Sequence, residues 1–141
     1  MATERTLLIV KPDAVAAGNM GKILALLEGE GGFRVVALQL VRLSEESART
    51  FYAMHVGKDF FEGLVRFMTS GPCLPMVLER ENAVSGLRDF IGVTDPQQAR
   101  DGSIRRLYGT DIQRNAVHAS DSEGAAEREI AHFFPGVGNP L

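Results

Sequence analysis

The sequence has 141 residues, the length of one domain of ordinary size, and 45% of them are hydrophobic and 23% charged. This composition supports a hydrophobic core and excludes a long disordered chain or a mini-protein that needs staples to fold. The formal net charge of −3 disfavours a protein that binds mainly to a phosphate backbone, so we expect no dedicated nucleic-acid partner.

The cysteine content and the length of the apolar runs indicate the cellular compartment in which the protein is expected. Cys73 is the only cysteine, which excludes an intramolecular disulfide and a zinc site built on thiolates and suits a reducing environment. The apolar runs are far shorter than the ~20 residues of a membrane-spanning helix, and no signal-peptide hydrophobic region follows the N-terminus. We therefore expect a cytoplasmic protein without a membrane partner.

Hydrophobic periodicity and turn residues predict the elements of the fold. In chain order these are a strand over 5–11, helix 19–29, strand 33–42, a helix from Ser44 to Ala53, helix 59–69, strand 73–79, helix 82–91, strand 115–118 and a helix ending near Phe134. Pro12 and Asp13 stop the first strand, and Pro75 predicts that 73–79 is an edge or distorted strand. The order matches an α+β, ferredoxin-like split βαβ fold, a four-stranded antiparallel sheet covered by helices, in one domain over 1–141.

His118 lies at the end of a predicted strand, directly before a helix whose start has the capping-box pattern Ser120-Asp121-Ser122-Glu123. A helix N-terminus favours a phosphate, although a surface histidine at a turn is the alternative. On a helical wheel Glu129 falls in the middle of the apolar side of this last helix, where a carboxylate needs a partner. His118 is a candidate, because a carboxylate on one ring nitrogen leaves the other free to attack. Arg114 is the alternative partner.

Lys11 ends the first strand on a partly apolar side, where it is either a solvated terminus or a cation aimed at an anion. The long polar stretch 92–113 is typical of a functional or disordered segment. It is flanked by Arg88, Arg105, Arg106 and Arg114. Several cations near one helix N-terminus would suit a polyphosphate, but the sequence has no Walker A motif and no Gly-x-Gly-x-x-Gly after a strand. His55 and His132 are expected to be structural or surface residues.

Residues 115–122, Asn-Ala-Val-His-Ala-Ser-Asp-Ser, resemble the signature of the nucleoside diphosphate kinases. The similarity continues in order along essentially the whole chain. It includes Lys11-Pro12-Asp13-Ala14-Val15, Phe51-Tyr52, Phe60-Phe61, Gly63-Leu64-Val65, Ser70-Gly71-Pro72, Arg88, Gly92-x-Thr94-x-Pro96, Gly102-Ser103-Ile104-Arg105, Ala126-x-x-Glu129-Ile130 and Phe133-Phe134. The chain thus resembles nucleoside diphosphate kinases of the bacterial type.

The resemblance implies an enzyme that transfers the γ-phosphate of a nucleoside triphosphate, typically ATP, to a nucleoside diphosphate. The transfer would follow a ping-pong mechanism with broad base tolerance, in which His118 becomes a phosphohistidine. Glu129 would orient His118, with Ser120 beside the pair. The phosphate and ribose site would consist of Lys11, Tyr52, Arg88, Thr94, Arg105 and Asn115. The base would stack on Phe60 and pack against Leu64 and Ile112.

The resemblance also implies Mg²⁺ as a cofactor, held mainly through the nucleotide phosphates rather than by protein ligands. It implies a homo-oligomer, and the short C-terminus, ending at Leu141, favours a tetramer over a hexamer.

Several features of the sequence depart from the family pattern or keep other hypotheses open. Ala119 stands where the family usually has glycine, and alanine resists a positive φ. In an ideal strand Asn115 and His118 point to opposite faces, so only a bend would bring both to one nucleotide. Ala119 and the altered strand around Pro75 motivate a ferredoxin-like regulatory module that binds nucleotide without turnover. The excess of 12 arginines over 3 lysines motivates an accessory role in nucleic-acid binding.

Overall fold

A computed structural model describes residues 3–137 of the chain. Within them four strands form one antiparallel sheet in the order β2-β3-β1-β4, which confirms the predicted α+β architecture. The strands are β1 (Thr3–Val10), β2 (Arg34–Leu38), β3 (Leu74–Glu81) and β4 (Val117–Ala119). β1 and β3 pair along their whole length and form the centre of the sheet.

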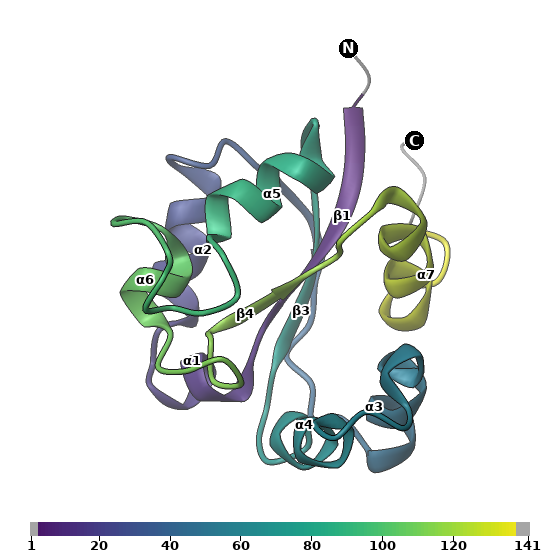
Figure 1. The fold of residues 1–141 in the computed structure, drawn as a ribbon. Coiled ribbons are helices and arrows are strands. Elements are labelled where there is room, and N and C mark those ends of the chain that lie inside the picture. Colours follow the sequence, from purple (N-terminus) through teal and green to yellow (C-terminus); the bar gives the residue numbers. More distant parts are fainter. Residues whose placement is uncertain (1–2, 138–141) are drawn as a thin grey trace.

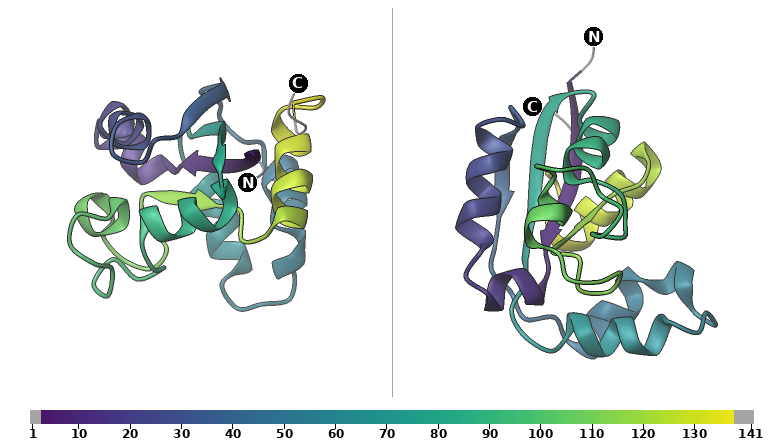
Figure 2. Two further views of the ribbon diagram at one scale, coloured as in Figure 1. Left: turned by 90° about the horizontal axis from the view of Figure 1, so that it is seen from above. Right: turned by 60° about the vertical axis from the view of Figure 1, so that its left-hand side comes forward.

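Helices cover both faces of this sheet (Figures 1 and 2). One face carries α1 (Pro12–Ala16), α2 (Met20–Glu28), α5 (Ala83–Ile91) and α6 (Ile104–Tyr108). The other carries α3 (Glu45–Phe51), a 3₁₀ turn (Ala53–His55), α4 (Phe61–Met68) and α7 (Glu123–Phe133). Because side chains alternate along a strand, Leu8 and Val10 enter the first core, and Leu7 and Ile9 enter the second. Burial on both sides explains the unbroken apolar run of β1.

The position of β3 corrects the prediction made from Pro75, because β3 lies between β2 and β1 and is not an edge strand. Pro75 is tolerated because it stands where β2 ends, with Leu38 opposite Met76 as the last regular pair. The Pro75 carbonyl still accepts a hydrogen bond from Gln39 N at 3.2 Å, so only the donor that proline lacks is missing from the ladder.

Two short helices are absent from the sequence prediction. Pro12 begins α1 instead of merely ending β1, since proline suits the first position of a helix. Ser103 caps α6 by accepting a hydrogen bond from Arg106 N, inside the stretch that the sequence predicts to be irregular. The cap of α7 is Ser122, and the capping-box assignment to Ser120 is wrong. In residues 3–137 no helix has both the length and the apolar character needed to cross a bilayer.

Candidate active site

A tight turn at Ala116 supplies the bend between Asn115 and His118. Ala116 has φ +75°, and Val117 N donates to Asn115 O at 2.9 Å, the hydrogen bond of a γ-turn. Such backbone strain in a non-glycine residue costs about 1–3 kcal/mol and persists only where the surroundings impose it. Here Lys11 N donates to Ala116 O at 2.8 Å, and Ala116 N donates to Asp13 Oδ2 at 3.0 Å. The start of the chain therefore fixes the bend that precedes the histidine.

Ala119 is not strained. The non-glycine residues with positive φ in the described chain are Asn82 and Ala116. Ala119 lies in β4, opposite Leu8 of β1, where an alanine is as suitable as a glycine. The expectation of a backbone penalty at this position is therefore wrong.

His118 is held by a buried carboxylate. Its Nε2 lies 2.8 Å from Glu129 Oε1, and Ser120 Oγ donates to the same oxygen at 2.8 Å. The Glu129 side chain is 5% exposed and that of His118 is 22% exposed. Since a carboxylate only accepts, Nε2 carries the proton of a neutral ring. No hydrogen bond within residues 3–137 engages Nδ1, which is left for a ligand.

Two competing influences act on Glu129. Burial alone would raise the pKa of this carboxyl, but the hydrogen bond from His118, the positive charge that this ring carries when it is protonated, and the hydrogen bond from Ser120 outweigh burial and lower the pKa. The group therefore stays ionised and keeps orienting the ring. This confirms the partner that the helical wheel predicted.

Lys11 links the start of α1 to the strand that bears the histidine. Its Nζ donates to Gln113 O and to Asn115 Oδ1, both at 2.8 Å. Asn115 Nδ2 in turn donates to Thr94 O at 3.0 Å. Burial lowers the pKa of Lys11 to about 8; Asp13 opposes this shift and Arg105 adds to it. Lys11 is therefore a buried cation rather than a solvated strand end.

Two of the four flanking arginines converge on the same place. Arg105 is buried and donates to Gly92 O at 3.1 Å and to Val117 O at 2.9 Å. Burial, with repulsion from Arg88, lowers the pKa of Arg105 to about 10. Arg88 donates to Ala119 O at 3.2 Å, beside the histidine. Arg106 instead donates to Gln97 O at 3.0 Å and does not join them.

One cavity of about 550 Å³ is lined by Lys11, Arg88, Arg105, Asn115, His118 and Glu129. It gathers every predicted site residue except Ser120, which lies behind Glu129. At its outer end are Phe60, 50% exposed, Ile112, 62% exposed, and the half-buried Leu64. Tyr52 is buried beside His118, with ring centroids 6.0 Å apart. Burial raises the pKa of Tyr52 far above its usual value, so its phenol stays neutral. The cavity therefore joins a cationic inner end to an apolar mouth.

Comparison with known proteins identifies this arrangement. The sequence profile described as nucleoside diphosphate kinase matches residues 4–137. The nucleoside diphosphate kinase of Sorangium cellulosum is 52% identical over 136 residues, which cover 96% of this chain and 94% of that protein. The chain belongs to the nucleoside diphosphate kinase family.

Solved structures agree with this assignment. The nucleoside diphosphate kinase of Aquifex aeolicus is 46% identical and has a TM-score of 0.92, with 99% of this chain and 100% of that chain covered. The enzyme of Halobacterium salinarum, solved in complex with CDP, is 45% identical at the same TM-score, with 97% and 91% covered. The molecule is therefore an enzyme with nucleoside diphosphate kinase function.

This nucleoside diphosphate kinase has cavity residues that the sequence interpretation missed. They include Met54, His55, Gln113 and Asp121. The ring of His55 lies 5.1 Å from that of Phe60, so its assignment as a structural or surface residue misses its place in the cavity wall. The signal was available, since His55 follows Tyr52 by three residues and shares its side of a helical turn.

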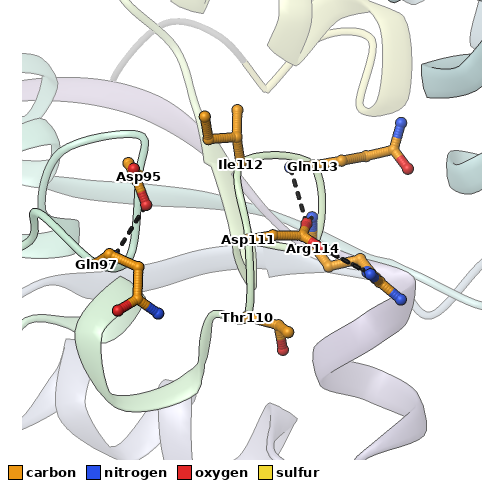
Figure 3. Close-up of a pocket in the computed structure, with 7 residues that line it drawn as sticks. All are labelled: Asp95, Gln97, Thr110, Asp111, Ile112, Gln113 and Arg114. Carbon is orange, nitrogen blue, oxygen red and sulfur yellow. Dashed lines mark hydrogen bonds and ion pairs between the residues drawn. The ribbon is translucent and has the colours of Figure 1, made fainter.

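A second hollow, of about 570 Å³, is lined by the loop over 110–114 of this kinase together with Asp95 and Gln97 (Figure 3). Asp111 organises that loop, because its Oδ1 accepts from Gln113 N and Arg114 N while its Oδ2 lies 2.6 Å from Arg114 Nη2. Arg114 thus pairs with Asp111, and the alternative in which it pairs with Glu129 is wrong. The same turn presents Ile112 to the main cavity.

Proposed function

We propose that this nucleoside diphosphate kinase carries the transferred phosphate on Nδ1 of His118. The observation that supports this most strongly is that only one of the two ring nitrogens of His118 is hydrogen-bonded to the protein. Glu129 occupies Nε2 and fixes the tautomer, and Nδ1 remains a free nucleophile in a cavity lined with cations. The halophilic relative solved with CDP supports a nucleotide as the occupant.

In the first half-reaction the Nδ1 lone pair attacks the γ-phosphorus of a nucleoside triphosphate. The bond between the γ-phosphorus and the bridging oxygen breaks, and its electron pair leaves with the nucleoside diphosphate. The ring becomes cationic, and the Glu129 carboxylate opposite Nε2–H stabilises it. A second nucleoside diphosphate then attacks the phosphohistidine by the reverse path. One cavity serves donor and acceptor in turn.

The cations of the cavity are suited to phosphate. In the described part of the chain, none of Lys11, Arg88 and Arg105 forms an ion pair with a carboxylate. Lys11 and Arg105 are buried, and since burying a positive charge is unfavourable, a polyphosphate that neutralises this charge would be favoured here. These groups would also stabilise the charge on the equatorial oxygens during transfer.

The apolar mouth is suited to a base. Phe60 and Ile112 would enclose its two faces, with Leu64 beside them, and Lys11 and Asn115 would bind the ribose. Stacking on an aromatic ring is available to every base, which explains broad base tolerance. The apolar mouth would thus bind the base, while the cationic inner end would bind the phosphates.

Mg²⁺ would be the cofactor and would be held mainly by the nucleotide phosphates. The donor set fits this arrangement, because Glu129 is engaged with His118 and Ser120, and no group of three or more metal-ligating His, Cys, Asp or Glu side chains occurs within residues 3–137. The metal would neutralise phosphate charge and hold the polyphosphate in one conformation. Lys11, Arg88 and Arg105 bind and orient the same phosphates.

We also expect a homo-oligomer, with a tetramer favoured over a hexamer, in the cytoplasm. The C-terminal end on which the tetramer expectation rests lies outside the described residues. Light scattering on the purified protein distinguishes the two assemblies by mass.

Phosphate transfer itself is the decisive test. The protein is incubated with Mg²⁺ and γ-labelled ATP, freed of nucleotide, and chased with GDP, with His118→Ala in parallel. We expect acid-labile, alkali-stable label on the wild type alone, and its release as GTP. Label on His118→Ala would contradict the assignment. Bound nucleotide without any label would favour a module that binds nucleotide without turnover. The structure does not support the two observations that suggested such a module, since Ala119 has no positive φ and the strand with Pro75 lies inside the sheet.

A further inference from the structure

Glu129 alone does not fix the angle of the His118 ring. Rotation about the bond between Cβ and Cγ of a histidine is soft. Nε2 lies close to that rotation axis, so its hydrogen bond to Glu129 constrains the rotation weakly, whereas Nδ1 lies further from the axis and moves with the ring. The phosphorus must meet Nδ1 in line. Another contact is therefore needed to set the ring angle.

Phe51, at the end of α3, supplies that contact. Its buried ring meets the His118 ring edge to face, with centroids 5.3 Å apart and planes at 69°. Phe51 also meets the ring of His132, with centroids 5.3 Å apart and planes at 65°. Edge-to-face pairs of this kind are favourable and directional. The Phe51 ring therefore transmits its own position to the nucleophile.

His132 is fixed in turn by α3. Its Nε2 lies 2.9 Å from Ser47 Oγ, in a hydrogen bond that joins α7 to α3. The two helices lie on the same face of the sheet (Figures 1 and 2). Ser47 and Phe51 are four residues apart on α3, and Glu129 and His132 are three apart on α7, so each pair shares one side of its helix. The hydrogen bond thus ties the helix with the orienting carboxylate to the helix with the orienting ring.

We propose that Phe51, His132 and Ser47 are positioning residues for phosphoryl transfer, and that the hydrogen bond between Ser47 and His132 holds Phe51 against the nucleophile. This inference rests on the proposed phosphohistidine function. None of the three groups donates to the phosphate or the base. Their contribution is to the angle of His118, so they act on the rate of phosphorylation and not on nucleotide affinity.

Ser47→Ala removes the hydrogen bond without disturbing the core, because Ser47 is only half-buried. Ser85→Ala, an exposed serine on α5, is the matched control. We measure the single-turnover rate of His118 phosphorylation at saturating Mg-ATP, the dissociation constant of ADP and the thermal midpoint. Small misplacements of reacting groups are costly, so we expect the rate to fall roughly tenfold in Ser47→Ala, with ADP affinity within about twofold of wild type. Ser85→Ala should match wild type in all three.

Substitutions at His132 sharpen the test. His132→Gln keeps a polar group toward Ser47 and should recover part of the rate that His132→Ala loses. Nitrogen NMR of the histidine rings should show the Nε2–H tautomer of His118 in both the wild type and Ser47→Ala, because Glu129 fixes it, so a slower rate in the variant reports the ring angle and not the position of the proton. A wild-type phosphorylation rate in Ser47→Ala overturns the positioning role, whatever the thermal midpoint, and leaves the kinase mechanism standing. No phosphorylation of the wild type overturns both.

Discussion

The two ends of the cavity are built in opposite ways. At the inner end hydrogen bonds of 2.8 Å join Lys11 to Asn115, which lies 104 residues further along the chain, and His118 to Glu129. At the mouth Phe60 and Ile112 are half exposed or more. Rigid hydrogen bonding defines one phosphate geometry, while a loose apolar mouth accepts different bases. With the site roles proposed above, the specificity of this enzyme would lie in the group transferred rather than in the nucleoside that carries it.

The largest effect should follow from Glu129→Gln at the inner end. The amide keeps the volume of the carboxylate but loses the charge that stabilises the cationic ring. Removing such an orienting partner typically lowers activity about 10–100-fold, and we expect the upper part of that range in single-turnover phosphorylation. Glu127→Gln, on the exposed side of the same helix, is the control and should retain the wild-type rate. Equal rates in both variants would show that the charge is unimportant.

Lys11 should make nucleotide binding depend on pH. Burial lowers the folded-state pKa of Lys11 to about 8, below that of an unfolded lysine, so the folded protein loses this cation as the pH rises through 8. We expect ADP affinity measured by calorimetry to weaken by up to about tenfold per pH unit above 8, since one charge is lost. The folding contribution has the opposite sign, because the unfolded chain binds more protons in this range and stability rises with pH.

Lys11→Met is the control for that dependence. It should bind ADP weakly but with a flat profile between pH 7.5 and 9.5. It should also lack the gain in urea resistance above pH 8 that Lys11 gives the wild type. Parallel pH profiles in the two proteins would assign the dependence to another group.

The smallest effects should come from the mouth. Phe60→Ala should raise KM about tenfold for purine and pyrimidine diphosphates alike, since stacking contributes about 1–3 kcal/mol for any base, and should leave kcat nearly unchanged. Ile112→Ala should raise KM only about twofold to threefold, because this side chain is 62% exposed. Steady-state kinetics with ADP, GDP, CDP and UDP measure both. A rise in KM confined to one of the four diphosphates would mean that the mouth discriminates between bases.

Helical periodicity predicted the pairing of Glu129 with His118, whereas the other residues of the proposed nucleotide site came from the resemblance to the family. The position of Glu129 in the apolar stripe of α7 indicated a functional carboxylate, because a buried charge needs a partner close in space. The bend at Ala116 could not be predicted in the same way. Alanine has no preference for φ +75°, and the conformation is imposed by Lys11 and Asp13, which are distant in sequence. Likewise, Pro75 indicated an edge strand because proline lacks a donor for a neighbouring strand. The sequence does not show that β2 already ends opposite Met76, so that a donor at Pro75 is not needed.

The turn at Ala116 also makes the orientation of His118 depend on how much of the polypeptide has been synthesised. Its long-range hydrogen bonds come from residues 11–13, which are synthesised before β4 and α7, the two elements that pair with or pack on β1. A nascent chain in which α7 has not yet been made therefore has no oriented histidine, however well its other strands have paired. Recovery of activity during refolding should coincide with the slowest spectroscopic phase, since the first and last parts of the chain must meet before any phosphate can be accepted.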